Sequence, residues 1–281
     1  MPTWHETPTS TFRVFAAITT LILLPGAGGA QNVSHSTSVA LDFNSDYTSL
    51  SSSYGQRGSF ERLYWSLNAA HLAYEEPTLS SWTTTAIVGA RLLSAGAGRV
   101  NLEAKVTNTD HYKTELEYAA ASAKLSYATM INETVSVTAA VSHEDDWTSA
   151  AGQDHQSLGL NISGTAQLGD VRVGGGVNLS DVDFETPLNE THTLYNFSVD
   201  APLSDRTTAS LDLSDGTVVS TFRTDRIHVR ARNEQQSASL RLAHQFSDSL
   251  SLVGYYSITE NISEDQAIET QAGGLRVRFE F

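Results

Sequence analysis

The sequence predicts an all-β fold, a transmembrane antiparallel up-and-down β-barrel, from three observations. Apolar and polar residues alternate along many segments, as the period of two of strand side chains requires. Short turns alternate with longer polar connections, which would give the two ends of the strands different kinds of loop. The last nine residues, GGLRVRFEF, form an alternating strand that ends on an aromatic residue.

Residues 1–30 have the order of a secretory signal peptide. Arg13 precedes an apolar run over residues 14–24, a Pro-Gly pair interrupts the run, and small residues lead to Ala30. A positive residue, an apolar core, a helix breaker and a small-residue cleavage site follow one another in this way in such peptides. We therefore predict cleavage after Ala30 and a mature chain, residues 31–281, that forms a single barrel domain.

Composition excludes several classes of protein. The chain has 17 Lys and Arg against 32 Asp and Glu, a net charge of −15, and no cysteine. Without cysteine there is no disulfide framework and no thiolate metal site. The acidic surplus argues against a nucleic-acid partner, because phosphates reward clusters of Lys and Arg. The nine histidines show no metal-ligand spacing, so we predict no metal and no cofactor.

Several segments read as strands with one apolar and one polar face. Within residues 100–106, Val100, Leu102 and Val106 share one face, and Glu103 and Lys105 lie on the other. The same rule holds in residues 82–93, 134–142, 157–168, 237–246 and 249–258. Period-two alternation of this length is the signal of a strand that is half apolar and half polar.

The connections decide between two all-β architectures. Short turns recur about every 36 residues, and longer polar connections lie between them. A soluble sandwich would bury its apolar faces against a second sheet, whereas a membrane barrel would turn them to lipid. Short turns at one end and longer loops at the other are typical of transmembrane barrels, which favours the barrel.

The C-terminal strand carries the most specific pattern. One of its faces presents an apolar set that ends on the terminal aromatic: Gly273, Leu275, Val277, Phe279 and Phe281. This pattern resembles that of Gram-negative outer-membrane β-barrel proteins. The resemblance implies that the strand is the insertion signal read by the barrel assembly machinery, and that it closes the barrel against the first strand. It also implies the outer membrane as location and outer-membrane lipid as a partner.

The number of strands follows from the hairpins. From Phe60 to the end the sequence gives six hairpins, and hence twelve strands. The Ser-rich stretch 36–58 either adds a pair of strands or forms a lead-in. Because single-chain bacterial barrels favour even numbers, we predict twelve strands, with fourteen as the alternative.

A passive channel is the function that we predict. A barrel of twelve or more strands is wider than its side chains can fill, unlike one of eight. The composition and the final strand resemble the small porins of α-proteobacteria, although an obvious long acidic constriction loop is missing from the first half. The prediction is a porin-like diffusion channel for small hydrophilic solutes. A structural or adhesive barrel without transport is the alternative.

Charge placement predicts which residues would line such a channel. In TDRIHVRAR the basic residues alternate with apolar ones, and further charges lie on the polar faces of other strands. We predict a basic lumen wall facing an acidic one, formed by Arg226, Arg230, Arg232, Arg241, Arg276, Arg278, Glu103, Glu115 and Glu117. The alternative is that these arginines pair with neighbouring carboxylates or reach into a solvated loop.

An outer-membrane hydrolase is the rival class, and we predict that the chain is not an enzyme. The stretch from His143 to Asp146 and the pair Asp154-His155 flank one connection. Catalysis needs side chains within hydrogen-bond reach, but adjacent strand residues point to opposite faces. We therefore interpret these residues as a solvated acidic loop.

Overall fold

A computed structural model describes residues 32–44, 48–74, 80–95, 98–111, 117–150, 152–224, 227–263 and 266–280. The predicted signal peptide, Glu115, Arg226 and Phe281 lie outside these residues. The described residues form fourteen strands: β1 (Asn32–Asn44), β2 (Thr48–Phe60), β3 (Leu63–Tyr74), β4 (Ser81–Ala95), β5 (Gly98–His111), β6 (Glu117–Met130), β7 (Val135–Thr148), β8 (His155–Leu168), β9 (Val171–Phe184), β10 (Leu188–Ser204), β11 (Thr207–Arg223), β12 (His228–Ser247), β13 (Leu250–Ile262) and β14 (Ala267–Glu280).

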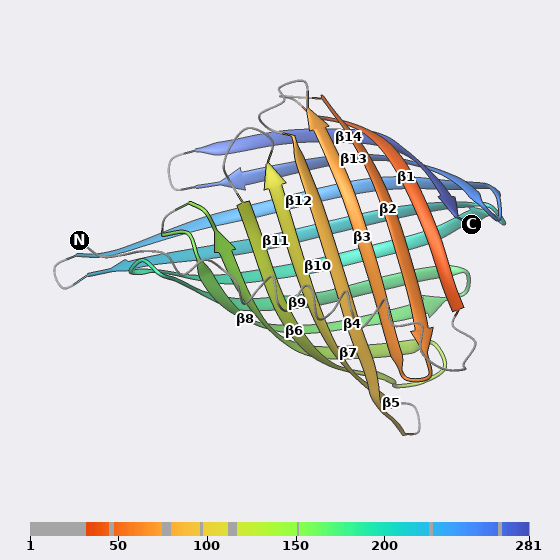
Figure 1. Ribbon diagram of the computed structural model, residues 1–281, viewed down its shortest axis with the longest axis horizontal. Helices are drawn as coiled ribbons and strands as arrows, with labels where there is room; N and C mark the ends of the chain where they lie inside the picture. Colours follow the sequence, from red (N-terminus) through yellow and green to blue (C-terminus); the bar gives the residue numbers. More distant parts are fainter. Residues whose placement is uncertain are drawn as a thin grey trace.

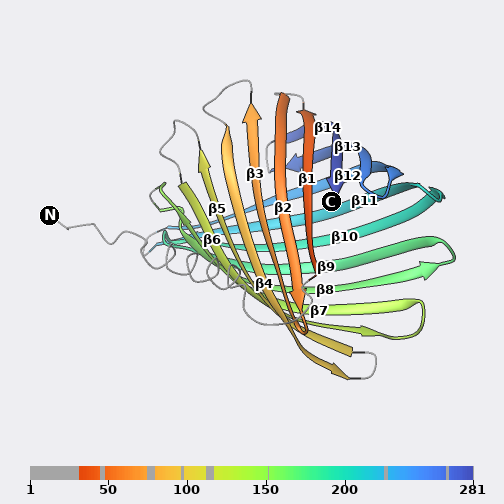
Figure 2. The same cartoon turned by 45° about the vertical axis from the view of Figure 1, so that its right-hand side comes forward.

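The strands close into a barrel in which each one pairs with its neighbours in the chain (Figure 1). The first and last strands join antiparallel, from Ser36 opposite Glu280 to Asn44 opposite Ala272. Figure 2 shows β1 beside the final strands. The predicted all-β barrel and its closure by the C-terminal strand are confirmed.

The prediction of twelve strands is wrong, because the Ser-rich stretch forms the pair β1 and β2. Few apolar residues mark β2, where the outer face carries Leu50 and Tyr54 while serines occupy much of the inner face. Serine is a weak strand signal on its own. Pairing with β1 and β3 satisfies the backbone of β2, so it holds its place without strong alternation.

The barrel has two different ends. Short connections, including residues 61–62, 169–170, 205–206 and 248–249, form the turn end, where the strand ends at Asn32 and Glu280 also lie. The connections at the opposite end, the loop end, are mostly longer, such as the six residues between β7 and β8. Strands β10, β11 and β12 are the longest, with 17, 17 and 20 residues. At the loop end the hairpin of β11 and β12 projects beyond the rest of the barrel (Figure 1).

The outer face of the strands is apolar and exposed. Leu160, Leu240 and Leu275 are 40%, 57% and 55% exposed, and no large side chain of the described residues is fully buried. A soluble protein would have to cover such a surface, since exposed apolar patches of this extent mark membrane or protein contacts. A closed barrel with an outer apolar band matches the surface of a membrane-spanning barrel. Among the described residues there is no helix long and apolar enough to span a membrane.

Candidate functional site: the inner wall of the barrel

The inner face of each strand is identified by its alternation with the exposed apolar residues. Leu240 and Leu242 of β12 face outward, so Arg241 between them faces the lumen. By the same rule Glu103, Arg276 and Arg278 of the predicted set lie on the inner wall.

Arg230 and Arg232 lie on the outer wall, which corrects the prediction that they line the lumen. They are opposite Thr221 and Val219 on β11, and no register shift separates them from Arg241 in β12. An even spacing in a continuous strand keeps residues on one face, and an odd spacing puts them on opposite faces. Arg232 forms an ion pair with Glu234, with a distance of 2.9 Å between Nη2 and Oε1.

Glu117 is also on the outer wall, at the loop end of β6, and its predicted lumen position is corrected for the same reason. The neighbouring Tyr118 points inward and bonds to Asp146, while Leu125 and Tyr127 share the outer face with Glu117. Glu117 is the first residue of β6 and lies at the rim of the barrel.

The inner wall of the described strands carries nearly equal numbers of positive and negative side chains, although the whole chain has a net charge of −15. Nine are positive: Arg57, Arg91, Arg99, Lys105, Lys124, Arg172, Arg241, Arg276 and Arg278. Eight are negative: Asp42, Glu103, Glu144, Asp146, Glu190, Asp200, Asp212 and Glu280. Much of the acidic surplus therefore lies outside the inner wall.

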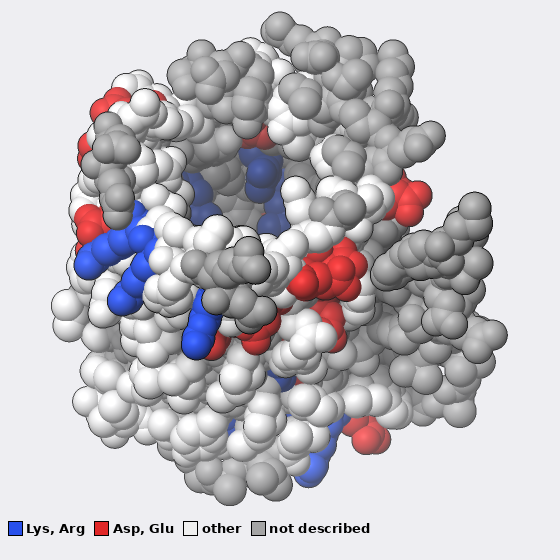
Figure 3. Space-filling model, turned by 90° about the vertical axis from the view of Figure 1, so that its left-hand side faces the viewer, with Lys and Arg blue, Asp and Glu red and all other residues white. Residues whose placement is uncertain are grey.

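The two signs are distributed unequally along the axis. All nine positive residues lie within the first eight residues of their strands, counted from the turn end. Four carboxylates, Asp42, Glu144, Asp146 and Glu190, lie at the tenth position or beyond. The turn-side half of the wall therefore holds nine positive against four negative groups. Looking into the loop end, Figure 3 shows a hollow with Lys and Arg side chains deep inside it and acidic side chains near the rim.

Wall hydroxyl groups hold several of the inner carboxylates. Tyr64 donates to Glu103 over 3.1 Å, and Ser210 donates to Asp200 over 2.5 Å. The phenol of Tyr64 lies over Gly89, where a Cβ would be 2.0 Å from its Cζ atom, so the glycine leaves room for this bond. Hydroxyl groups of the wall therefore occupy part of the acceptor capacity of these two carboxylates.

The positive side chains have few anionic partners. Among these nine described residues, Arg278 alone has a carboxylate within 4 Å: its Nη2 atom lies 2.6 Å from Oε1 of Glu280. Arg57 donates to the hydroxyl of Ser34 over 2.8 Å. Arg241 donates to that of Ser210 over 3.4 Å, which leaves most of its donors unoccupied by the wall.

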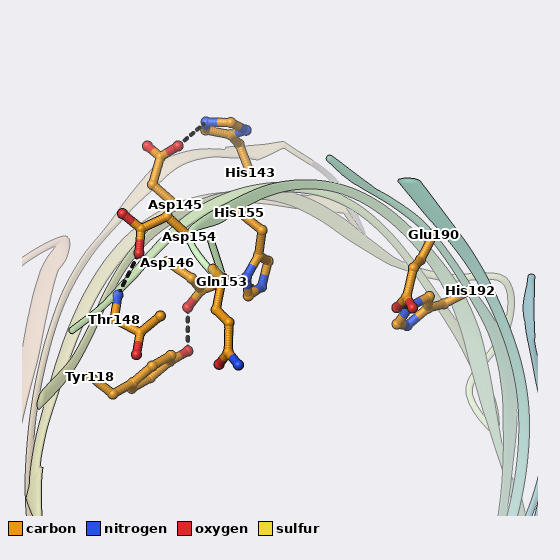
Figure 4. Close-up of polar contacts among 10 residues, drawn as sticks. All are labelled: Tyr118, His143, Asp145, Asp146, Thr148, Gln153, Asp154, His155, Glu190 and His192. Carbon is orange, nitrogen blue, oxygen red and sulfur yellow. Dashed lines mark hydrogen bonds and ion pairs between the residues drawn. The ribbon is translucent and has the colours of Figure 1, made fainter. Parts of the chain in front are cut away.

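At the loop end, Tyr118, Asp146 and His155 converge on the inner face from β6, β7 and β8 (Figure 4). Tyr118 donates to one oxygen of Asp146, and Nε2 of His155 lies 2.9 Å from the other. The Asp146 side chain is 4% exposed. The prediction of a loop over these residues is wrong, because β7 continues to Thr148 and pairs Asp146 with His155. The sequence pattern did not predict this cluster, because its three members come from three different strands and meet only through strand pairing.

A second polar group, from β10 and β11, faces the lumen (Figure 4). His192 and Glu190 are 2.9 Å apart, and Ser220 donates to the same carboxylate over 2.8 Å. The described residues contain no group of three or more His, Asp or Glu placed to hold a metal ion.

A hydrogen bond crosses the seam where the barrel closes. The hydroxyl of Tyr255 on β13 donates to Asp42 on β1 over 2.7 Å, although β14 lies between the two strands. Gly274 of β14 is directly opposite both residues. A Cβ at this position would lie 2.5 Å from Oδ1 of Asp42, so the bond requires a glycine here.

Several outer-membrane proteins of known structure have a similar fold. OmpT of Vibrio cholerae superposes with a TM-score of 0.57 at 10% identity, covering 92% of this chain and 99% of that one. CdiB from Acinetobacter baumannii gives 0.52 at 11% identity, covering 90% and 61% of the respective chains. A bacterial polysaccharide outer membrane secretin gives 0.50 at 10% identity, covering 88% and 98%. No protein-family model and no curated protein matches the sequence.

The fold is that of an outer-membrane β-barrel. The outer apolar band and these likenesses agree with the predicted location in the outer membrane. Identities near 10% establish the shared fold and leave the transported solute and the closer likeness to small α-proteobacterial porins as predictions.

Proposed function

We propose that the barrel is a passive diffusion channel for small hydrophilic solutes. One observation carries the proposal: a closed barrel of fourteen strands is lined largely by short side chains. Strands spaced about 4.8 Å apart and tilted by about 40° enclose a cylinder about 28 Å across when there are fourteen of them.

The inner faces are too small to fill that width. On β8, for example, the inner positions between His155 and Gln167 are Ser157, Gly159, Asn161, Ser163 and Thr165. Side chains of this size cannot meet across the lumen, whereas a barrel of eight strands is filled by its own side chains. The hollow visible at the loop end in Figure 3 supports the same proposal.

Conductance of the refolded mature chain in planar bilayers tests the proposal. We expect ohmic, long-lived steps, and swelling of liposomes in isotonic solutions of small sugars. Gel mobility before and after heating would verify that the inserted protein is a folded barrel. A verified barrel that conducts no ions and passes no sugar would contradict the channel.

Surface display is the second candidate, and the projecting β10–β12 segment favours it. Its outer wall carries Arg230 and Arg232 beyond the apolar band, where they are exposed. A barrel that displays this hairpin and conducts nothing would fit the structural or adhesive alternative. Deleting the hairpin should then abolish binding to a surface partner while leaving the barrel folded.

We also propose that the chain has no catalytic activity and that the Tyr118, Asp146 and His155 cluster is structural. The contacts of His155 in the described residues are Asp146, the carbonyl of Gln153 and the ring of Phe184. A hydrolase would need an activated nucleophile next to this histidine. Assays with ester and peptide substrates on the folded barrel test this part of the proposal.

A further inference from the structure

The turn-side half of the inner wall, which we call the basic belt, contains the nine positive side chains defined above. We infer that the basic belt binds small solutes that carry two or more negative charges, such as phosphates and dicarboxylates. This inference rests on the proposed channel for its transport role, while the binding itself can be measured without transport.

The first argument is the local charge. Nine positive groups face four carboxylates in this half of the lumen, in a chain whose total charge is −15. A wet cavity lined by one dominant sign, with low-dielectric walls, raises the local concentration of counter-ions. Anions are therefore enriched at the belt even though the whole chain is acidic.

The second argument is that most positive side chains of the belt form no ion pair with a carboxylate of the inner wall. Arg278 has an ion pair with Glu280, but the other eight belt residues have no carboxylate within 4 Å in the described strands. Tyr64 and Ser210 instead hydrogen bond the nearby Glu103 and Asp200. Asp200 is opposite Arg172 and Glu103 is opposite Lys124 in the strand registers, but neither carboxylate forms an ion pair with a belt residue, so the belt cations retain free donors for a solute.

The third argument is spacing. Arg276 and Arg278 are two residues apart on the inner face of β14, about 7 Å along the strand. Arg241 lies two strands away on β12, on the same side of the lumen. A single monovalent anion can engage one of these groups at a time, whereas a phosphate or a dicarboxylate can engage two.

The axial asymmetry predicts that binding depends on the side of addition. An anion coming from the turn end reaches the belt first. One coming from the loop end must pass the carboxylates of Asp42, Glu144, Asp146 and Glu190. A multivalent anion should therefore block the channel more strongly from the turn side.

The test uses inorganic tripolyphosphate as a blocker of the potassium chloride current through the full mature barrel in planar bilayers. The inner double variant Arg172→Gln with Arg276→Gln removes two charges from the belt. The matched control, Arg230→Gln with Arg232→Gln, removes the same two charges from the outer wall. Orientation is read from a Thr186→Cys reporter at the loop end, labelled with a bulky impermeant thiol reagent, because the chain has no other cysteine.

We expect the tripolyphosphate concentration that halves the current to be about tenfold lower for addition from the turn side than for addition from the loop side. The inner variant should raise the half-blocking concentration about tenfold, because each exposed ion pair contributes a modest free energy and a factor of ten corresponds to about 1.4 kcal/mol. The control should remain within twofold of the wild type. Raising the salt to 1 M should weaken the block, since the screening length falls to about 3 Å.

Equal effects of the inner and outer variants, or equal block from both sides, would overturn the inference. Equilibrium dialysis of tripolyphosphate against the detergent-folded barrel distinguishes a failure of the inferred binding site from a failure of the proposed channel. Binding that the inner variant weakens, without any conductance, would keep the site and reject the channel. Conductance without tripolyphosphate binding would keep the channel and reject the site.

Discussion

Gly274 is the position where a single methyl group should weaken the closure of the barrel. The added Cβ of Gly274→Ala would lie 2.5 Å from Oδ1 of Asp42, 2.7 Å from the carbonyl oxygen of Leu41 and 2.7 Å from Cε1 of Tyr255. Side-chain rotation can relieve two of these contacts only by breaking the bond between Tyr255 and Asp42. The third contact is with backbone, which is fixed by pairing across the seam.

The expected cost has two parts. Losing a hydrogen bond to a carboxylate costs about 1.5 to 3 kcal/mol. Forcing a methyl group against a paired backbone costs about 1 to 3 kcal/mol more. We expect Gly274→Ala to lower the free energy of unfolding by about 2.5 to 6 kcal/mol and Tyr255→Phe to lower it by about 1.5 to 3 kcal/mol.

Urea unfolding of the barrel in lipid vesicles, followed by tryptophan fluorescence, measures these changes. Gly164→Ala is the matched control, because its Cβ would have no neighbour closer than 3.5 Å. In a Tyr255→Phe background the cost of Gly274→Ala should shrink by roughly the contribution of the lost bond. If Gly274→Ala unfolds at the same urea concentration as Gly164→Ala, or if the cost of Gly274→Ala is unchanged in the Tyr255→Phe background, the seam contact does not stabilise closure of the barrel.

Three further outcomes are expected. Leu240→Arg, on the outer wall, should cost about 2 to 4 kcal/mol near the midplane, whereas Ser239→Arg on the inner wall should fold normally; equal heat-modifiable fractions on gels would mean that the faces are reversed. Phe281→Asp should reduce assembly into the outer membrane without affecting export, and unchanged recovery in the outer-membrane fraction would count against the insertion signal. Asp146→Ala should leave Tyr118 and His155 without their shared acceptor and speed amide exchange at the loop ends of β7 and β8; protection equal to the wild type would show that the cluster does not hold these ends.

The alternation of residues predicted strands well where the outer wall faces lipid. The pattern predicts that Glu103, between Leu102 and Ala104 on β5, faces the lumen, because an apolar outer wall forces the polar residues inward. β2 lacked that contrast, since Ser52 and Gln56 interrupt its outer face, and only its pairing with β1 and β3 shows that it belongs to the barrel. The strand number therefore depended on long-range pairing that no local pattern records.

The same rule failed where the strands leave the bilayer. Above the apolar band both faces of a strand meet water, so a charged residue no longer identifies the lumen side. Arg230 and Arg232 alternate with Val229 and Ala231 as a membrane strand would, but here the apolar residues face inward and the arginines outward. Register with the membrane-spanning part of β12, through Arg241, determines the face.

The net charge of the chain is likewise a poor guide to its lumen, because screening separates the two ends of the barrel. On β10, Glu190 lies ten residues from Asp200, which is opposite Arg172 in the belt. Ten residues at about 3.3 Å each, tilted by about 40°, correspond to about 25 Å along the axis. The screening length at physiological salt is about 8 Å. The carboxylate of Glu190 can therefore attract cations to the loop-end mouth of the proposed channel without cancelling the positive potential of the belt.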